Sequence, residues 1–210
     1  MSEKLTPRKQ LNKEDLIRSA AERLFLQNGF AGTIMDAVTK EAGVSKQTVY
    51  SYYASKDDLL IDVLKKLSHS LTESLVSLEH FTFNNQNELQ QVLRHLAHQY
   101  IRSLMQSNYL ALMRVIISES PRFPQLGELF RSTLPNTAYT SVSAVLQQAK
   151  NKGLVHSVDT DAAVRMFVGP LLTYILLGGV IVTDRPFQQP ETEEIDAIVD
   201  LYMKAIVKDH

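Results

Sequence analysis

A short polar run between Ser45 and Tyr53 carries the side chains best suited to contact another molecule. If residues 46–53 form a helix, Val49 and Tyr53 lie on one side, and the opposite side presents Lys46, Gln47, Thr48, Ser51 and Tyr52. Each of these five side chains can donate a hydrogen bond, and none is acidic. Such a face suits phosphates and base edges, which accept hydrogen bonds. The alternative is a polar helix face that only meets water.

Two short helices joined by a glycine turn are expected to position this face. Thr33 and Asp36 have the spacing of a capping box, so a helix is predicted to start there. Apolar residues then recur at the spacing of one helix face, at Ile34, Val38 and Ala42. Gly43 ends that helix, because glycine adopts the left-handed C-cap conformation without a Cβ clash. Ser45 caps the second helix.

A scaffold helix should precede this pair. Asn12 can cap it, Asn28-Gly29 can end it, and Phe30 follows as a core residue. Its apolar stripe consists of Ile17, Ala20, Ala21, Leu24 and Phe25. Residues 1–11 are polar and are expected to form an arm that either reaches a duplex through basic side chains or is merely solvated.

A long helix is predicted to follow the pair. Ser55 can cap it, with Asp58 at the third position beyond the cap. Apolar residues then hold helical spacing for about six turns, at Leu59, Leu60, Val63, Leu64, Leu67, Leu71, Leu75 and Leu78. Such a helix can link two lobes.

At these residues the chain resembles a known family. The run Thr33…Ala42-Gly43-Val44-Ser45…Tyr50-Ser51-Tyr52-Tyr53…Lys56…Leu59 closely resembles the DNA-binding domain of TetR-type transcriptional regulators. There are two departures, since the family usually has alanine where Thr39 stands and phenylalanine where Tyr53 stands. The string VIISESPRFPQL, further along, is similar to the C-terminal domain of the AefR-like branch.

The resemblance implies an all-α, homodimeric, ligand-responsive regulator, most simply a repressor. It implies a helix-turn-helix domain at residues 1–56, joined by the long helix to a ligand-binding and dimerisation domain at residues 57–210. Two recognition helices would enter successive major grooves of a pseudo-palindromic operator in double-stranded DNA, about 34–36 Å apart. We expect Lys46 and Gln47 to contact base edges, with Ser51 on the same face. Phosphate contacts are expected from Thr33, Ser45, Thr48, Tyr50, Tyr52 and Lys56.

The charge distribution agrees with DNA binding at one end of the chain. Residues 1–56 carry nine basic and six acidic side chains, a net +3, which leaves −4 for the other 154 residues. This excess is modest, so two copies on one duplex are needed for tight binding at physiological salt. The chain has no cysteine and its N-terminal ten residues lack an apolar signal core, so a cytoplasmic protein is expected.

The remaining helices are predicted to form a lobe that holds a small-molecule effector. Their expected ranges are 89–104, 109–119, 126–133, 137–152, 161–183 and 191–207. A cavity for a largely hydrophobic effector could be lined by Tyr100, Leu104, Leu112, Met113, Ile116, Phe123, Phe167, Leu171 and Tyr174. Periodicity alone favours plain core for each of these residues, and it is the family resemblance that favours a cavity.

Residues 166–183 carry no charge and are long enough to suggest a membrane span. Pro170, the glycines and the missing basic flanks favour burial between protein surfaces instead. The last helix has an apolar stripe at Ile195, Ile198, Val199, Tyr202 and Ile206. We therefore expect a homodimer through the last two helices, with Tyr202 at the contact and no membrane.

Other kinds of site are weakly supported. His95 and His98 have a spacing that could hold a metal ion, but satisfied or exposed histidines are the simpler interpretation. No catalytic residue, metal site or cofactor is predicted. The alternative function is a helical small-molecule-binding protein or enzyme without specific DNA binding.

Overall fold

The computed structural model describes residues 12–75, 81–132, 134–182 and 186–207. Over these ranges the chain is helical apart from short connections and one isolated antiparallel bridge between Val155 and Val207, which confirms the all-α prediction. The chain divides into two compact units, Met1–Leu67 and Ser68–His210. The boundary expected between residues 56 and 57 lies at the start of a helix whose first part belongs to the first unit. The predicted arm, Leu78 and Thr183 lie outside the described residues.

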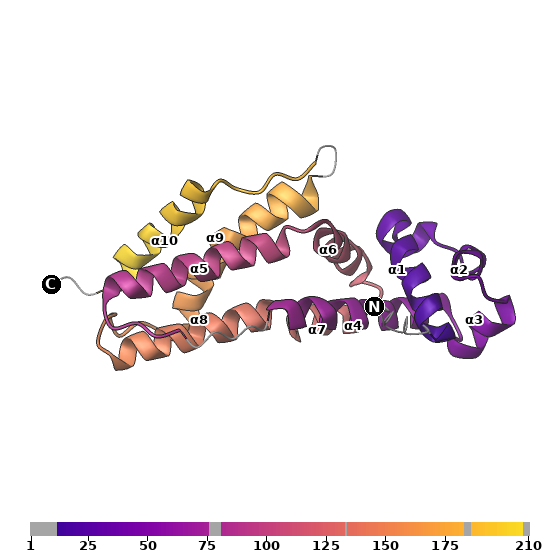
Figure 1. Ribbon diagram of the computed structural model, residues 1–210, viewed down its shortest axis with the longest axis horizontal. Coiled ribbons are helices and arrows are strands. Elements are labelled where there is room, and N and C mark those ends of the chain that lie inside the picture. Colours follow the sequence, from indigo (N-terminus) through magenta and orange to yellow (C-terminus); the bar gives the residue numbers. More distant parts are fainter. Residues whose placement is uncertain (1–11, 76–80, 133, 183–185, 208–210) are drawn as a thin grey trace, which may run out of the picture. The chain divides into compact units, whose positions relative to one another are not determined.

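The first unit contains α1 (Lys13–Gly32), α2 (Met35–Ala42), α3 (Lys46–Tyr52) and the first part of α4 (Lys56–Leu75), as Figure 1 shows. The predicted cap of α1 is confirmed, since Asn12 Oδ1 accepts a hydrogen bond from the Asp15 amide at 2.7 Å. Gly29, at φ 70°, interrupts the helix where an end was predicted. The core of the unit includes Ile17, Ala20, Ala21, Phe25, Phe30, Val38, Val49, Leu59, Leu60 and Val63.

The start of α2 differs from the prediction. Ile34 takes the N-cap position without a side-chain cap, and its side chain is 61% exposed rather than part of the inner face. Met35 and Val38 form that face instead. Thr33 caps nothing, because its hydroxyl turns inward and donates to the carbonyls of Leu24 and Gly29 at 3.1 and 2.9 Å.

The second unit is built around α5, which contacts α6, α8, α9 and α10. In Figure 1, α10 runs beside α5. The helices and their bounds are α5 (Gln86–Leu104), α6 (Ser107–Glu119), α7 (Pro124–Ser132), α8 (Leu134–Asn151), α9 (Thr160–Ile175), η1 (Leu176–Ile181) and α10 (Thr192–Ile206).

The long apolar stretch does not continue as one regular helix. After Ile175 it becomes a π-helical segment, η1, and the carbonyl groups at the end of this segment have no partner within the helix. Arg114 on α6 supplies donors to them, with Nη2 bonded to the Gly179 carbonyl and Nε to the Val180 carbonyl. The absence of a side chain at Gly179 lets η1 approach Leu110 of α6 closely.

The apolar stripe of α10 faces the inside of its own protomer. Ile195, Val199, Tyr202 and Ile206 are all buried, and the Tyr202 ring packs edge-on against Phe167 with 5.2 Å between ring centres. The expectation that Tyr202 lies at a dimer contact is therefore wrong, because this stripe covers the core of the unit.

The close approach at Gly179 gives a stability prediction. A Cβ atom there would lie 2.7 and 2.9 Å from the two methyl groups of Leu110, whose side chain is itself buried. We expect Gly179→Ala to lower the free energy of unfolding by about 1–3 kcal/mol, measured by urea denaturation. Gly127→Ala on α7 is the control, since a Cβ there meets nothing within 4 Å and should be neutral or stabilising by up to about 1 kcal/mol. Equal stabilities of the two variants would contradict the contact.

Candidate nucleic-acid interface

The turn and caps that hold α3 are those predicted. Gly43 lies in the left-handed region at φ 66°, and its amide donates to the Lys40 carbonyl at the end of α2. Ser45 Oγ then accepts from the Thr48 amide at 3.1 Å, which caps α3. Val49 is fully buried and Tyr53 is 6% exposed, so the inner face of α3 is also as predicted.

The outer face of α3 is available to a partner molecule. Lys46, Gln47, Tyr50, Ser51 and Tyr52 are exposed, the two tyrosines at 45% and 47%. Three hydroxyls of the predicted set, those of Ser45, Thr48 and Ser51, already take part in local hydrogen bonds. Thr48 Oγ1 lies 2.8 Å from Ser45 Oγ, and Ser51 donates to the Thr48 carbonyl at 2.7 Å.

An acidic side chain from α2 lies beside this face, and the residue spacing within α3 does not reveal it. Asp36 Oδ1 is 2.7 Å from Lys46 Nζ, and both side chains are more than 60% exposed. The hydrogen bond from Lys46 to Asp36 raises the pKa of the lysine, so its ammonium stays charged. A phosphate or base that uses Lys46 must replace a carboxylate partner. The only sequence signal was the position of Asp36 in the first turn of α2.

Two predicted phosphate contacts have structural partners inside the unit. Lys56 Nζ donates to the Phe30 and Thr33 carbonyls, both at 2.8 Å, and lies 4.1 Å from the centre of the Phe30 ring. The Thr33 side chain is 1% exposed. Beside them lies an open groove of about 360 Å³, lined by Thr33, Ile34, Met35, Asp36, Tyr50 and Lys56.

The predicted effector-lining residues are mostly packed core. Eight of the nine are buried, namely Tyr100, Leu104, Leu112, Met113, Ile116, Phe123, Phe167 and Leu171. The Tyr100 hydroxyl donates to the Ala138 carbonyl at 3.2 Å, and burial raises its pKa to about 12. The ninth, Tyr174, borders a hollow that could hold a small molecule.

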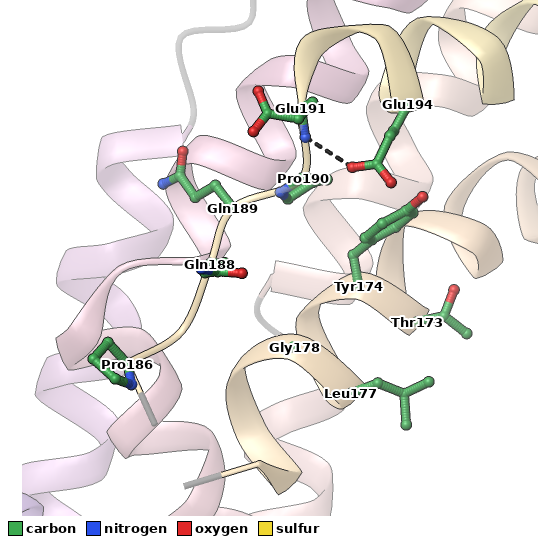
Figure 2. A pocket seen from close by; sticks show the side chains of 10 residues that line it. All are labelled: Thr173, Tyr174, Leu177, Gly178, Pro186, Gln188, Gln189, Pro190, Glu191 and Glu194. Carbon is green, nitrogen blue, oxygen red and sulfur yellow. Dashed lines mark hydrogen bonds between the residues drawn. The ribbon is translucent and has the colours of Figure 1, made fainter. Parts of the chain in front are cut away.

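That hollow is open on one side and has a volume of about 640 Å³. Figure 2 shows it between the end of α9 with η1 and the segment that leads into α10. Its lining residues are Thr173, Tyr174, Leu177, Gly178, Pro186, Gln188, Gln189, Pro190, Glu191 and Glu194. Glu194 accepts the Glu191 amide at 2.9 Å, which closes a capping box at the start of α10.

The two histidines considered for a metal have separate surroundings. His98 Nε2 lies 2.8 Å from Asp196 of α10, whereas the His95 ring packs against Phe81 at 5.8 Å between ring centres. Both border a second open hollow of about 440 Å³, together with Ile101, Arg102, Gln189, Pro190, Thr192 and Ile195. The bond to Asp196 explains the position of His98, and the contact with Phe81 explains that of His95.

Comparison with known proteins identifies the two parts of the chain. Residues 17–63 match bacterial regulatory proteins of the TetR family, and residues 91–205 match the C-terminal domain of AefR-like transcriptional repressors. The uncharacterized HTH-type transcriptional regulator YvaF of Bacillus subtilis is 26% identical over 191 residues, which cover 89% of this chain and 92% of YvaF.

Solved structures of similar fold match nearly the whole chain. The flavonoid-responsive regulator FrrA is 30% identical, with a TM-score of 0.66, and the match covers 94% of this chain and 98% of FrrA. A TetR-family regulator from Mesorhizobium loti is 25% identical, with a TM-score of 0.69 and coverage of 96% and 100%. These matches argue against the alternative function, which was a small-molecule-binding protein or enzyme without specific DNA binding. The chain belongs to the TetR family of DNA-binding transcriptional regulators and has an AefR-like C-terminal domain.

Proposed function

We propose that this regulator is a cytoplasmic repressor that binds a pseudo-palindromic operator as a homodimer and is released by a small molecule. The observation that carries the proposal is the exposed, donor-rich face of α3, held by a capped and buried inner side. Repression is supported by the match of residues 91–205 to AefR-like repressors.

Side chains on α3 divide into two roles in this proposal. Gln47 and Lys46 stand in the first turn, where a recognition helix reaches base edges, and Gln can bond to adenine in a bidentate manner. Lys46 exchanges Asp36 for a base or phosphate on binding. Ser45, Thr48, Tyr50, Ser51 and Tyr52 contact phosphates, which position the helix without reading sequence. Thr33 and Lys56 stabilise the unit by donating hydrogen bonds to backbone carbonyls.

The dimer is proposed to form through the faces of α9 and α10 that the protomer leaves uncovered. Thr160–Ile181 is long and apolar enough to cross a membrane, and only 33% of its most apolar window is buried. Met166, Leu177 and Ile181 are 44%, 59% and 65% exposed, and Leu201 of α10 is 66% exposed. The other face of α9, with Phe167 and Leu171, belongs to the core of the unit. Because one face of α9 packs into the core of the unit, its other, exposed face is better covered by a second copy of the chain than by lipid.

The effector is proposed to bind beside Tyr174, because the rest of the predicted set is packed core. Tyr174 and Leu177 offer apolar surface there, and Thr173 and Gln188 offer hydrogen bonds. This mixture suits a molecule with an apolar body and several polar groups, and the name of FrrA shows that a similar protein responds to flavonoids. A hundredfold loss of operator affinity requires only about 2.7 kcal/mol of differential binding.

Selection of random duplex DNA by the purified protein tests operator binding. We expect a two-fold symmetric sequence to be enriched, with affinity that falls steeply as salt rises, because phosphate contacts release counterions. Enrichment of no sequence, with only weak salt-dependent binding, would contradict the proposal.

The two roles on α3 can be separated by substitution. Gln47→Ala should relax preference at one base step at a cost of about 1–3 kcal/mol, whereas Tyr50→Ala should weaken binding to all duplexes alike. Gln125→Ala, an exposed glutamine on α7 of the second unit, is the control and should change neither quantity. An unchanged preferred sequence for Gln47→Ala would show that Gln47 does not read a base.

The dimer surface can be tested by sedimentation. Leu201→Asp should yield monomers, because it places a charge in an apolar contact, while the fold measured by circular dichroism is retained. Ile117→Asp is the control, since Ile117 is also exposed, at 48%, but belongs to α6 rather than to α9 or α10. A dimeric Leu201→Asp protein would exclude Leu201 from the interface.

A further inference from the structure

The carboxylate of Asp62 joins three helices of the first unit. Its Oδ2 atom accepts one hydrogen bond from the Tyr53 hydroxyl and one from Arg18 Nε, both at 2.7 Å. Asp62 lies on α4, Arg18 lies on α1, and Tyr53 is the residue at which α3 ends. A single oxygen atom therefore holds the end of α3 against both neighbouring helices.

Arg18 is itself held firmly. Its Nη1 donates to Asp15 at 2.9 Å and its Nη2 to Glu14 at 2.6 Å, so every nitrogen of the guanidinium group has a carboxylate partner. Lys66 of α4 donates to the same oxygen of Asp15 at 3.0 Å. The Arg18 side chain is only 13% exposed. The Asp62 carboxylate is thus bound on one side by a group that has little freedom to move.

The charge states of Asp62 and Tyr53 favour a strong hydrogen bond between them. Burial acts to raise the pKa of Asp62, but the hydrogen bonds from Tyr53 and Arg18 outweigh it and hold the pKa below its ordinary value. Burial and the bond to Asp62 raise the pKa of Tyr53, so its hydroxyl stays protonated and can donate. A hydroxyl that donates to a carboxylate forms a stronger bond than one between neutral groups.

Apart from this link, α3 has few contacts that could set its orientation. The helix has seven residues, and Val49 is its one fully buried side chain among them. The ring of Tyr53 is buried just beyond these seven residues. Apolar burial of Val49 and of this ring is not directional, so it sets how close α3 lies more strictly than how α3 is rotated. The Tyr53 hydroxyl, at the far end of α3 from its Ser45 cap, supplies a directional constraint.

This hydroxyl is one of two that set the chain apart from the pattern it resembles. The family usually has phenylalanine where Tyr53 stands and alanine where Thr39 stands. Thr39 Oγ1 donates to the Met35 carbonyl at 2.9 Å, inside α2, and joins no second helix. The chain therefore contains a linking hydroxyl and a purely local one within the same unit.

We propose that Tyr53, Asp62 and Arg18 form a positioning link that sets the orientation of the recognition helix required for reading bases. The inference rests on the operator binding proposed above. Hydrogen bonds to base edges require a fixed helix orientation, whereas long side chains can follow phosphates over a range of positions. Loosening α3 should thus reduce affinity for the operator more than affinity for other DNA.

Tyr53→Phe tests the link because it removes the hydroxyl and keeps the buried ring. We expect the ratio of operator affinity to scrambled-duplex affinity to fall about tenfold, with scrambled-duplex affinity unchanged. Asp62→Asn removes the charge and weakens the hydrogen bonds from both Tyr53 and Arg18, so it should reduce the ratio at least as much. The double variant should lose less than the sum of the two single effects, because both substitutions act on the Tyr53–Asp62 bond. Thr39→Ala removes the local hydroxyl and should leave the ratio unchanged.

Hydrogen exchange of the free protein separates this inference from the proposed operator binding. Amides of α3 should exchange faster in Tyr53→Phe than in the wild type, while those in the middle of α1 keep their rates. Equal α3 exchange rates, an unchanged affinity ratio, or a parallel loss of both affinities together with helicity would each overturn the positioning role. If the wild-type protein enriches no sequence, operator binding fails and the exchange rates alone decide the link.

Discussion

A seven-residue helix forms too few backbone hydrogen bonds to persist alone in water, so α3 depends on the residues that border it. The left-handed conformation of Gly43 sets the direction in which the chain enters α3, and Ser45 accepts a hydrogen bond from an amide of its first turn. The burial of Val49 packs the middle of α3 against the unit. Tyr53 closes the far end against Asp62. Because these inner contacts account for the fold of α3, the side chains of Gln47, Tyr50 and Tyr52 stay exposed on its outer face and can meet DNA.

The break of α1 at Gly29 explains two polar residues that look like DNA contacts in the sequence. A kink leaves carbonyl groups without helical partners, and buried carbonyls need donors. Thr33 donates to the Gly29 carbonyl, and Lys56 donates to those of Phe30 and Thr33. The ammonium of Lys56 thereby ties the start of α4 to the end of α1. The positive charge of Lys56 therefore stabilises the fold of the DNA-binding unit and also adds to its electrostatic attraction for DNA.

Local signals predicted most helix ends, because caps and glycine turns act within a few residues, as at Asn12, Gly43 and Ser45. What they could not predict is which surface covers an apolar face. Tyr202 belongs to a clear apolar stripe, yet that stripe covers its own protomer's core, and Phe167 is core rather than cavity wall. The pairing of Asp36 with Lys46 joins two helices, and spacing within one helix does not reveal it.

The inner side of α9 and of the π-helical segment after it is apolar, and part of the outer side is apolar as well, at Met166, Leu177 and Ile181. Toward the inside, Arg114 and Leu110 of α6 hold η1 through its carbonyls and the space at Gly179. Toward the outside, Leu177 borders the hollow beside Tyr174 and also belongs to the exposed apolar face. In the proposed dimer, an effector in that hollow would meet the same side chain that packs against the second copy. In that arrangement effector binding and dimer geometry would be coupled, because a molecule that shifts Leu177 would also change the contact between protomers.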